Sequence, residues 1–109
     1  MQTLDRGGAN GDEITYPALV KALQAGAVAL VDVREANEYD AGHVEGSVLH
    51  PLSAFNPTQL PRDKPIVLIC RSGNRSMTAL KAARAAGFTD IWHYKGGALG
   101  WAKEGGELV

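Results

Sequence analysis

The residues that could do chemistry gather in one short segment that begins at Cys70, the only cysteine of the chain. The apolar run 66–70 ends at this cysteine, and a polar loop then leads into a helix-forming segment, a pattern that predicts a buried parallel strand, a loop and a helix. In such a unit the N–H groups of the loop and of the helix N-terminus point toward an anion at the carboxyl end of the sheet. Because peptide dipoles and guanidinium groups favour the charged form of a cysteine, we expect Cys70 to be a nucleophilic thiolate.

The loop after Cys70 supplies charges and hydrogen-bond donors. Arg71 and Arg75 can stabilise an anionic substrate or leaving group, and Gly73 allows the positive φ that such a loop usually needs. The other polar side chains are expected to hydrogen-bond within the loop and to keep its N–H groups pointing inward; they are Ser72, Asn74 and Ser76. Ser76 can equally well be interpreted as a helix cap. The segment therefore indicates a catalytic cysteine with a six-residue substrate-binding loop, and the structural alternative is a small buried cysteine at a strand end.

Strand and helix patterns alternate along the rest of the chain. Apolar or β-branched runs predict strands at residues 14, 28–33, 48–49, 66–70 and 91–94. Helical patterns occur at 15–26, 35–40, 75–86 and 99–103, and a loop with one helical turn is expected at 53–62. This alternation predicts an α/β fold with a small central parallel sheet of about four to five strands and helices on both faces. We expect a flexible, glycine-containing N-terminal tail over residues 1–12 and a single domain over residues 13–109.

Further motifs accompany the cysteine loop in a definite order. Leu-Val-Asp-Val-Arg-Glu stands at 30–35, Gly-His-Val-Glu-Gly-Ser at 42–47 and Gly-Gly-Ala-Leu-Gly-Trp at 96–101. Together with Cys-Arg-Ser-Gly-Asn-Arg-Ser at 70–76, these motifs resemble those of the rhodanese-like sulfurtransferases. The resemblance runs from about Ile14 to Trp101, nearly the whole chain, and implies a rhodanese-like fold.

The resemblance also implies a reaction in two displacements at Cys70. A sulfane-sulfur donor, such as thiosulfate or a protein persulfide, gives its outer sulfur to the thiolate and leaves a persulfide on Cys70. A thiophilic acceptor then takes that sulfur: cyanide in vitro, or a thiol or a protein in the cell. The implied partners are a small anionic sulfur donor and, as a further candidate, a sulfur-carrier protein; no cofactor is implied.

Two other functions remain open on the residues alone. Cysteine-dependent phosphatases use Cys-x5-Arg and related arsenate reductases also carry a longer loop, whereas here four residues separate Cys70 from Arg75. The shorter loop suits a persulfide better than a tetrahedral phosphoryl group. The second alternative is a sulfur-relay or partner-binding module with little turnover of its own, although such modules often lose the cysteine that this chain keeps. The residues do not separate a sulfur carrier from an enzyme.

Polar residues of the first motif are interpreted as a network that ties a strand end to the following short helix; they are Asp32, Arg34, Glu38 and His43. Asp32 is the expected partner of Arg75 beneath the loop, because it ends the neighbouring strand. Trp101, in the closing motif, is a candidate to border the active site. The histidines at 43, 50 and 93 lack the spacing of metal ligands, so we predict no metal site.

Composition fits one globular domain of ordinary size. The chain has 109 residues, of which 45% are hydrophobic and 21% charged. A net charge of −1 argues against nucleic-acid binding driven by bulk charge. No apolar run is long enough to span a bilayer, and the N-terminus lacks the apolar core of a signal peptide. We therefore expect a cytoplasmic protein without membrane association, with a secreted form whose signal was removed as the alternative.

Overall fold

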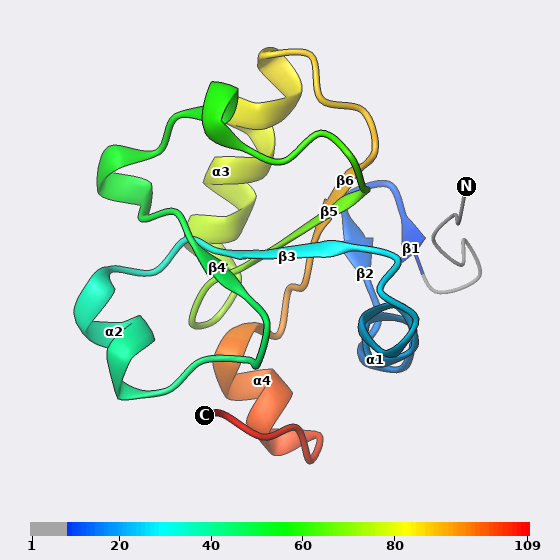
Figure 1. Cartoon of the computed structure of the whole chain (residues 1–109), viewed down its shortest axis with the longest axis vertical. Coiled ribbons are helices and arrows are strands. Elements are labelled where there is room, and N and C mark those ends of the chain that lie inside the picture. The colour runs from blue at the N-terminus through cyan, green and yellow to red at the C-terminus, as the bar shows by residue number, and fades with distance from the viewer. Residues whose placement is uncertain (1–8) are drawn as a thin grey trace.

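The centre of the molecule is a single sheet (Figure 1). In residues 9–109, the part of the chain that this computed structural model describes, six strands pair in the order β1-β2-β6-β5-β3-β4. The strands are β1 Ala9–Asn10, β2 Glu13–Ile14, β3 Ala29–Asp32, β4 Val48–Leu49, β5 Ile66–Ile69 and β6 Ile91–His93. The helices of the same part are α1 Tyr16–Gln24, α2 Ala36–Ala41, α3 Asn74–Ala85 and α4 Gly97–Lys103, with 3₁₀ turns at Leu52–Ala54 and Pro57–Gln59.

The strands β2 to β6 run parallel, whereas β1 runs antiparallel to β2. The predicted parallel sheet of about four to five strands is therefore confirmed. The added strand β1 forms a hairpin with β2, in which Ala9 lies opposite Ile14. Residues 1–8 of the expected tail lie outside the described residues, and its last four residues, 9–12, belong to this hairpin.

Side chains of the central strand alternate between two cores on opposite faces of the sheet. In β5, Val67 and Ile69 belong to the core that contains α1 residues, whereas Ile66 and Leu68 belong to the core that contains α3 residues. All four side chains are at most 1% exposed, as expected for a parallel strand that is covered on both faces. Figure 1 shows α3 on one side of the sheet and α1 and α4 on the other, which confirms the expected helices on both faces.

Local sequence sets where the helices begin. Thr15 caps α1, because its Oγ1 accepts a hydrogen bond from a first-turn N–H at 3.3 Å, and Pro17 fits this first turn because it needs no N–H partner there. A capping box between Glu35 and Glu38 starts α2. The start of α3 is different: its N-cap is Gly73, with a left-handed φ of 102°. This turn brings the N-terminus of a 12-residue helix next to the end of β5.

Two segments differ in detail from the sequence expectation. Residues 53–62 contain the end of one 3₁₀ turn and the whole of a second in place of one helical turn, and Pro57 stands at the start of the second. The last helix begins at Gly97, two residues earlier than predicted, because N–H groups of its first turn bond to carbonyl groups of the cysteine loop. Neither difference changes the order of the strands and α-helices.

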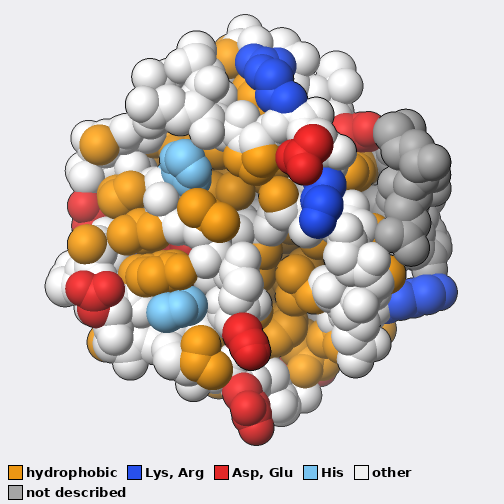
Figure 2. All heavy atoms as spheres, in the orientation of Figure 1, with side chains coloured by type: hydrophobic (Ala, Val, Ile, Leu, Met, Phe, Trp, Pro, Cys, Tyr) orange, Lys and Arg blue, Asp and Glu red, His pale blue; other side chains and the backbone are white. Residues whose placement is uncertain are grey.

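Charged side chains are dispersed on the face of the molecule that Figure 2 shows. Lys and Arg side chains lie apart there, Asp and Glu occur among them, and hydrophobic side chains spread across the middle. A nucleic-acid backbone would therefore meet no continuous basic surface on this face. Among the described helices, none is both long enough and apolar enough to cross a bilayer.

Candidate active site

Cys70 lies directly after β5, at the carboxyl end of the sheet, and the residue is only 1% exposed. The backbone N–H of Gly73 donates a hydrogen bond to Cys70 Sγ at 3.0 Å, and Ser76 Oγ lies 3.5 Å from the same sulfur. Because Gly73 is the N-cap of α3, the positive end of the helix dipole also lies beside the sulfur. The loop therefore surrounds Cys70 Sγ with groups that suit an anion.

Two opposing effects act on the pKa of the Cys70 thiol. Burial raises it, because a thiolate is poorly solvated inside a protein. Hydrogen bonds outweigh burial: the hydroxyl and N–H of Ser76 and the N–H groups of Gly73 and Ser72 together lower the pKa of Cys70 below its ordinary value. The strand–loop–helix pattern predicts the contribution of the backbone, whereas the Ser76 hydroxyl is an additional donor. The charge of Arg75 also interacts with Cys70.

Ser76 contacts the sulfur and does not cap the helix. Gly73 occupies the N-cap position of α3, and Ser76 lies in the first turn with no exposed surface. Ser76 Oγ lies 3.2 Å from Gly73 O and 2.7 Å from Nδ1 of His93. His93 ends β6 and is 1% exposed, so an imidazole, a hydroxyl and the Cys70 sulfur form one buried chain of contacts.

The contribution of His93 was missed by sequence reasoning, which considered this residue only as a metal ligand. The available signal was its position: residues 91–94 were predicted to form a strand parallel to the one that ends at Cys70. The carboxyl ends of parallel neighbours lie at the same edge of a sheet. In the structure β5 and β6 are such neighbours, and Leu68 pairs with His93.

The Gly-Gly motif fixes the loop from the opposite side. Two N–H groups of the first turn of α4 donate to the carbonyl oxygens of Cys70 and Arg71, at 2.8 and 3.2 Å. Gly97 has a φ of +66°, and a Cβ atom at this position would lie 2.2 Å from Arg71 O. At Gly73 a Cβ atom would lie 2.5 Å from Lys95 O. Backbone segments thus approach too closely for side chains, which explains both glycines.

The prediction that Arg75 pairs with Asp32 is wrong. Arg75 donates to both carboxylate oxygens of Glu38, at 2.6 and 2.9 Å, from the start of α3 to α2. Asp32 is instead bound by Arg34, whose Nε and Nη2 donate to it at distances between 2.8 and 3.1 Å. Arg34 stands two residues after Asp32 and turns back onto that carboxylate, so the carboxylate is already satisfied within its own strand end.

The other loop residues lie toward solvent. Arg71, Ser72 and Asn74 are exposed, and Asn74 is the first residue of α3. Of the predicted loop, the structure brings Gly73 and Ser76 to the sulfur, together with the N–H of Ser72. Within residues 9–109, no hydrogen bond or ion pair holds the exposed side chain of Arg71, so it is accessible to a bound anion.

The network expected around the first motif is present. Arg34 Nη2 donates to Gly42 O at 2.8 Å, which ties the end of β3 to the end of α2. His43 is held by Tyr39: its Nδ1 lies 2.8 Å from Tyr39 O, and the two rings stack 3.7 Å apart. Trp101 does not border the cysteine, because it belongs to the core on the α1 face, whereas Cys70 belongs to the opposite core.

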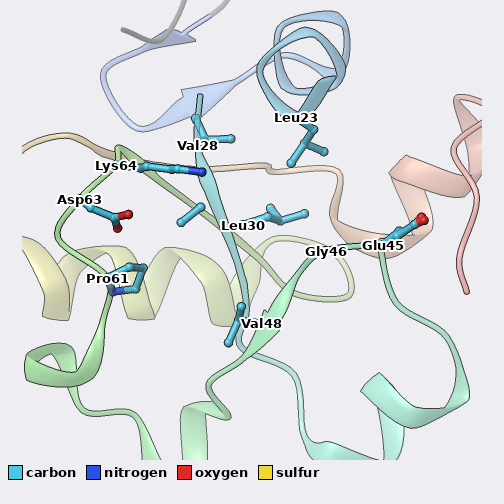
Figure 3. A pocket seen from close by; sticks show the side chains of 10 residues that line it. Leu23, Val28, Leu30, Glu45, Gly46, Val48, Pro61, Asp63 and Lys64 are labelled. Atoms are coloured by element: carbon cyan, nitrogen blue, oxygen red, sulfur yellow. The ribbon is translucent and has the colours of Figure 1, made fainter. Parts of the chain in front are cut away.

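A hollow of about 350 Å³ lies elsewhere, beside β3 and β4 (Figure 3). Leu23, Leu30 and Val48 form part of its wall, and Glu45 and Lys64 stand at its sides. No residue of the cysteine loop lines this hollow, so it is separate from the candidate active site. Within residues 9–109, no three His, Cys, Asp or Glu side chains gather as metal ligands would.

Comparison with known proteins gives a consistent set of matches. The model of the rhodanese-like domain matches residues 15–104. A protein of Mycobacterium tuberculosis named "Probable adenylyltransferase/sulfurtransferase MoeZ" is 42% identical over 101 residues, which cover 88% of this chain and 26% of that protein. The thiosulfate sulfurtransferase GlpE of Shewanella oneidensis is 31% identical over 85 residues, which cover 76% of this chain and 84% of GlpE.

A solved structure shows the same fold. The rhodanese-related protein of Thermoplasma volcanium superposes with a TM-score of 0.81 at 31% sequence identity, over 91% of this chain and 98% of that one. The lengths of the relatives differ widely: this chain spans about a quarter of MoeZ but most of GlpE. The similarity therefore concerns a domain that occurs both by itself and within longer proteins.

Proposed function

Because the chain belongs to the rhodanese-like domain family, we propose that it is a sulfurtransferase in which Cys70 carries the transferred sulfur as a persulfide. The proposal names thiosulfate or a protein persulfide as donor and a thiophilic group as acceptor. Relatives with this domain include proteins named as sulfurtransferases, one of them for thiosulfate.

The observation that carries the proposal is the set of donors around the Cys70 sulfur. The N–H of Gly73 at 3.0 Å and the hydroxyl of Ser76 at 3.5 Å stabilise a thiolate, which is the reactive form of the group. A persulfide is also an anion, and its terminal sulfur extends by one bond from the same position. The helix N-terminus and loop N–H groups therefore favour both the resting nucleophile and the covalent intermediate.

The covalent step balances without a further reactant. The Cys70 thiolate attacks the outer sulfur of thiosulfate, a new S–S bond forms, and the bond between that sulfur and the sulfonate sulfur breaks. Sulfite leaves with the electron pair of the broken bond, and Cys70 becomes a persulfide anion. The acceptor then attacks the outer sulfur and releases the original thiolate. Because charge is conserved at each step, no general base is needed once Cys70 is ionised.

Burial of Cys70 restricts the kind of donor. Because Cys70 is only 1% exposed, the reacting atom of a donor must be the terminal atom of that donor, so that it can enter the loop. The outer sulfur of thiosulfate and the terminal sulfur of a persulfide both have this geometry. The exposed Arg71 beside the cysteine is then suited to bind the negative remainder of the donor.

Mass spectrometry of the intact protein after incubation with thiosulfate tests the covalent step. We expect one added sulfur atom per chain, which cyanide removes as thiocyanate. Cys70→Ser, which keeps the shape of the side chain, should gain no sulfur and transfer none, and sulfite in place of thiosulfate should leave the wild-type mass unchanged. Since Cys70 is the only cysteine, the site of addition is unambiguous. Comparable turnover by the serine variant would contradict the proposal.

A further inference from the structure

The end of β6 places a buried histidine beneath the cysteine loop. His93 is 1% exposed, and its Nδ1 lies 2.7 Å from Ser76 Oγ, which in turn lies 3.5 Å from Cys70 Sγ. The other ring nitrogen, Nε2, is buried and has no hydrogen-bond partner among the described residues. The reaction proposed above gives this imidazole no chemical role, although it is two contacts from the reacting sulfur.

The surroundings of Nε2 determine which nitrogen carries the proton. A buried N–H without an acceptor is rarer and costlier than a buried lone pair without a donor. The neutral tautomer protonated at Nδ1 is therefore favoured, and Nδ1–H donates to Ser76 Oγ. His93 is expected to be neutral because burial lowers its pKa; nearby Glu13 and Asp12 oppose this shift, and Lys95 and Arg84 add to it.

The tautomer of His93 decides where the single hydroxyl proton of Ser76 goes. If Nδ1 were an acceptor, the 2.7 Å contact would take that proton, and Ser76 could give the Cys70 thiolate no hydrogen bond. With Nδ1 as a donor, the imidazole engages one lone pair of Ser76 Oγ and does not compete for the hydroxyl proton. Its proton is then left for Gly73 O at 3.2 Å or for Cys70 Sγ at 3.5 Å, and a sulfur anion is the stronger acceptor.

We propose that His93 is a positioning residue: its Nδ1–H group holds Ser76 so that the hydroxyl proton points at Cys70 Sγ and stabilises the thiolate. The inference deepens the proposed function, since it rests on Cys70 as the nucleophile. Its test uses ionisation of the thiol and needs no sulfur donor, so failure of sulfur transfer and failure of this inference give different results.

The experiment measures the Cys70 pKa by the pH dependence of iodoacetamide alkylation in four variants. His93→Leu removes the donor, His93→Asn keeps an N–H near the position of Nδ1, Ser76→Ala removes the hydroxyl, and a double variant combines Ser76→Ala with His93→Leu. We expect His93→Leu to raise the Cys70 pKa by about one unit, the effect of one hydrogen bond to a charged group. His93→Asn should stay close to wild type. The double variant should match Ser76→Ala alone.

Other outcomes would overturn the inference. An unchanged Cys70 pKa in folded His93→Leu, or a pKa in the double variant clearly above that of Ser76→Ala, would mean that His93 does not act through the hydroxyl. A His93→Asn variant that behaves like His93→Leu would mean that the N–H group is not what matters. Circular dichroism of each variant identifies any that fails to fold.

A measurement on the unmodified protein tests the inference if the leucine variants do not fold. Nitrogen-15 NMR of the imidazole distinguishes a protonated Nδ1 from a protonated Nε2 by their chemical shifts. We expect His93 to carry its proton on Nδ1 at neutral pH. A proton on Nε2 would leave Nδ1 as the acceptor of the Ser76 hydroxyl. This result would contradict the proposed direction of the hydrogen bonds, which runs from His93 through Ser76 to Cys70.

Discussion

Arg75 of the cysteine loop is paired with Glu38 of α2, a residue 37 positions earlier in the chain, through hydrogen bonds of 2.6 and 2.9 Å. The same carboxylate accepts the N–H of Glu35 and thereby closes the capping box of α2. Glu38 thus connects the start of one helix to the start of another. Since α3 begins within the cysteine loop, the pair also fixes the loop relative to α2.

The first prediction concerns stability in acid. Arg75 holds the pKa of Glu38 at about 2, below its ordinary value of 4.5, because the guanidinium binds the ionised form. The stabilising contribution is therefore full above about pH 4.5 and is lost as the pH falls toward 2. At neutral pH, Glu38→Gln should lower the free energy of unfolding by about 1 kcal/mol, after allowance for solvent screening of this partly exposed pair.

Urea unfolding of wild type and Glu38→Gln across pH measures this effect. The difference between the two proteins should shrink as the pH approaches 2. The exposed Glu45 provides a matched control, and Glu45→Gln should change the unfolding free energy little at any pH. If the difference in unfolding free energy between wild type and Glu38→Gln stays constant down to pH 2, the charge of Glu38 is not its cause.

The second prediction compares the two arginine–carboxylate pairs. Asp32 and Arg34 have side chains only 3% and 7% exposed, whereas those of Glu38 and Arg75 are 25% and 33% exposed. Removing Arg34 leaves a buried charge uncompensated, so Arg34→Met should cost about 3–5 kcal/mol of unfolding free energy. Arg75→Met leaves a carboxylate that water can reach and should cost about 1 kcal/mol. Urea unfolding of the two variants measures both losses. Equal losses would contradict the claim that the buried pair depends more strongly on its arginine than the partly exposed pair does.

The third prediction separates crowding from backbone strain at the Gly-Gly motif. Gly97 and Gly26 have nearly the same φ, +66° and +64°, but a Cβ atom meets Arg71 O at 2.2 Å in the first case and nothing within 4 Å in the second. Gly26→Ala should therefore cost only the strain of the left-handed conformation, about 1–2 kcal/mol. Gly97→Ala should cost more and displace the cysteine loop, so that sulfur transfer is lost in this variant alone.

Thermal unfolding and a thiosulfate–cyanide assay of both alanine variants supply the comparison. The carbonyl of Arg71 cannot move away from a Cβ atom without giving up its hydrogen bond from the first turn of α4. Equal stability and equal transfer in the two variants would show that the close approach at Gly97 is relaxed at little cost.

Sequence patterns predicted the order and type of elements well because the strands are buried. The unbroken apolar runs of β3 and β5 are typical of parallel strands, and Thr15 with Pro17 marks a helix start. The hairpin strand β1 was not predicted, because its two residues, Ala9 and Asn10, carry no strand pattern. The ends of the helices differ from the predicted bounds by one or two residues, since contacts with other segments determine where a helix begins.

The candidate site was predicted only as far as its residues are neighbours in sequence. Cys70 and its loop are contiguous, so their juxtaposition follows from the strand–loop–helix pattern. The partners that come from elsewhere, Glu38 and His93, depend on strand order and on which carboxylate another arginine has already bound. Asp32 was chosen for Arg75 by strand adjacency alone, and that criterion could not reveal that Arg34 turns back onto it.

The fourth prediction concerns the exposed arginine. The main chain of Arg71 is held by a hydrogen bond from Leu99 N, while the side chain is exposed beside the cysteine. If the Arg71 guanidinium binds the anionic end of the donor, Arg71→Gln should lower kcat/KM for thiosulfate by ~10–100-fold, the effect of one or two charge-assisted hydrogen bonds. Lys81→Gln removes an equal charge from an exposed position on α3 and should leave kcat/KM within a factor of about two. An equal loss in both variants would point to net charge rather than to a contact.

The last prediction tests loop length against phosphatase chemistry. Four residues separate Cys70 from Arg75, one fewer than in cysteine-dependent phosphatases, and both terminal nitrogens of Arg75 are already bound to Glu38. A phosphoryl group needs several donors for its three equatorial oxygens, and a loop arginine occupied by a carboxylate does not supply them. We therefore expect the wild-type protein to hydrolyse an aryl phosphate no faster than background. Insertion of one glycine after Gly73 should abolish sulfur transfer, because it displaces Ser76 and the start of α3, which follow the insertion, from their positions beside the sulfur. Steady-state assays with thiosulfate and an aryl phosphate on both proteins check these expectations. Robust wild-type phosphatase activity that Cys70→Ser removes would overturn the loop-length argument, since the same thiolate would then attack phosphorus within a loop of this size.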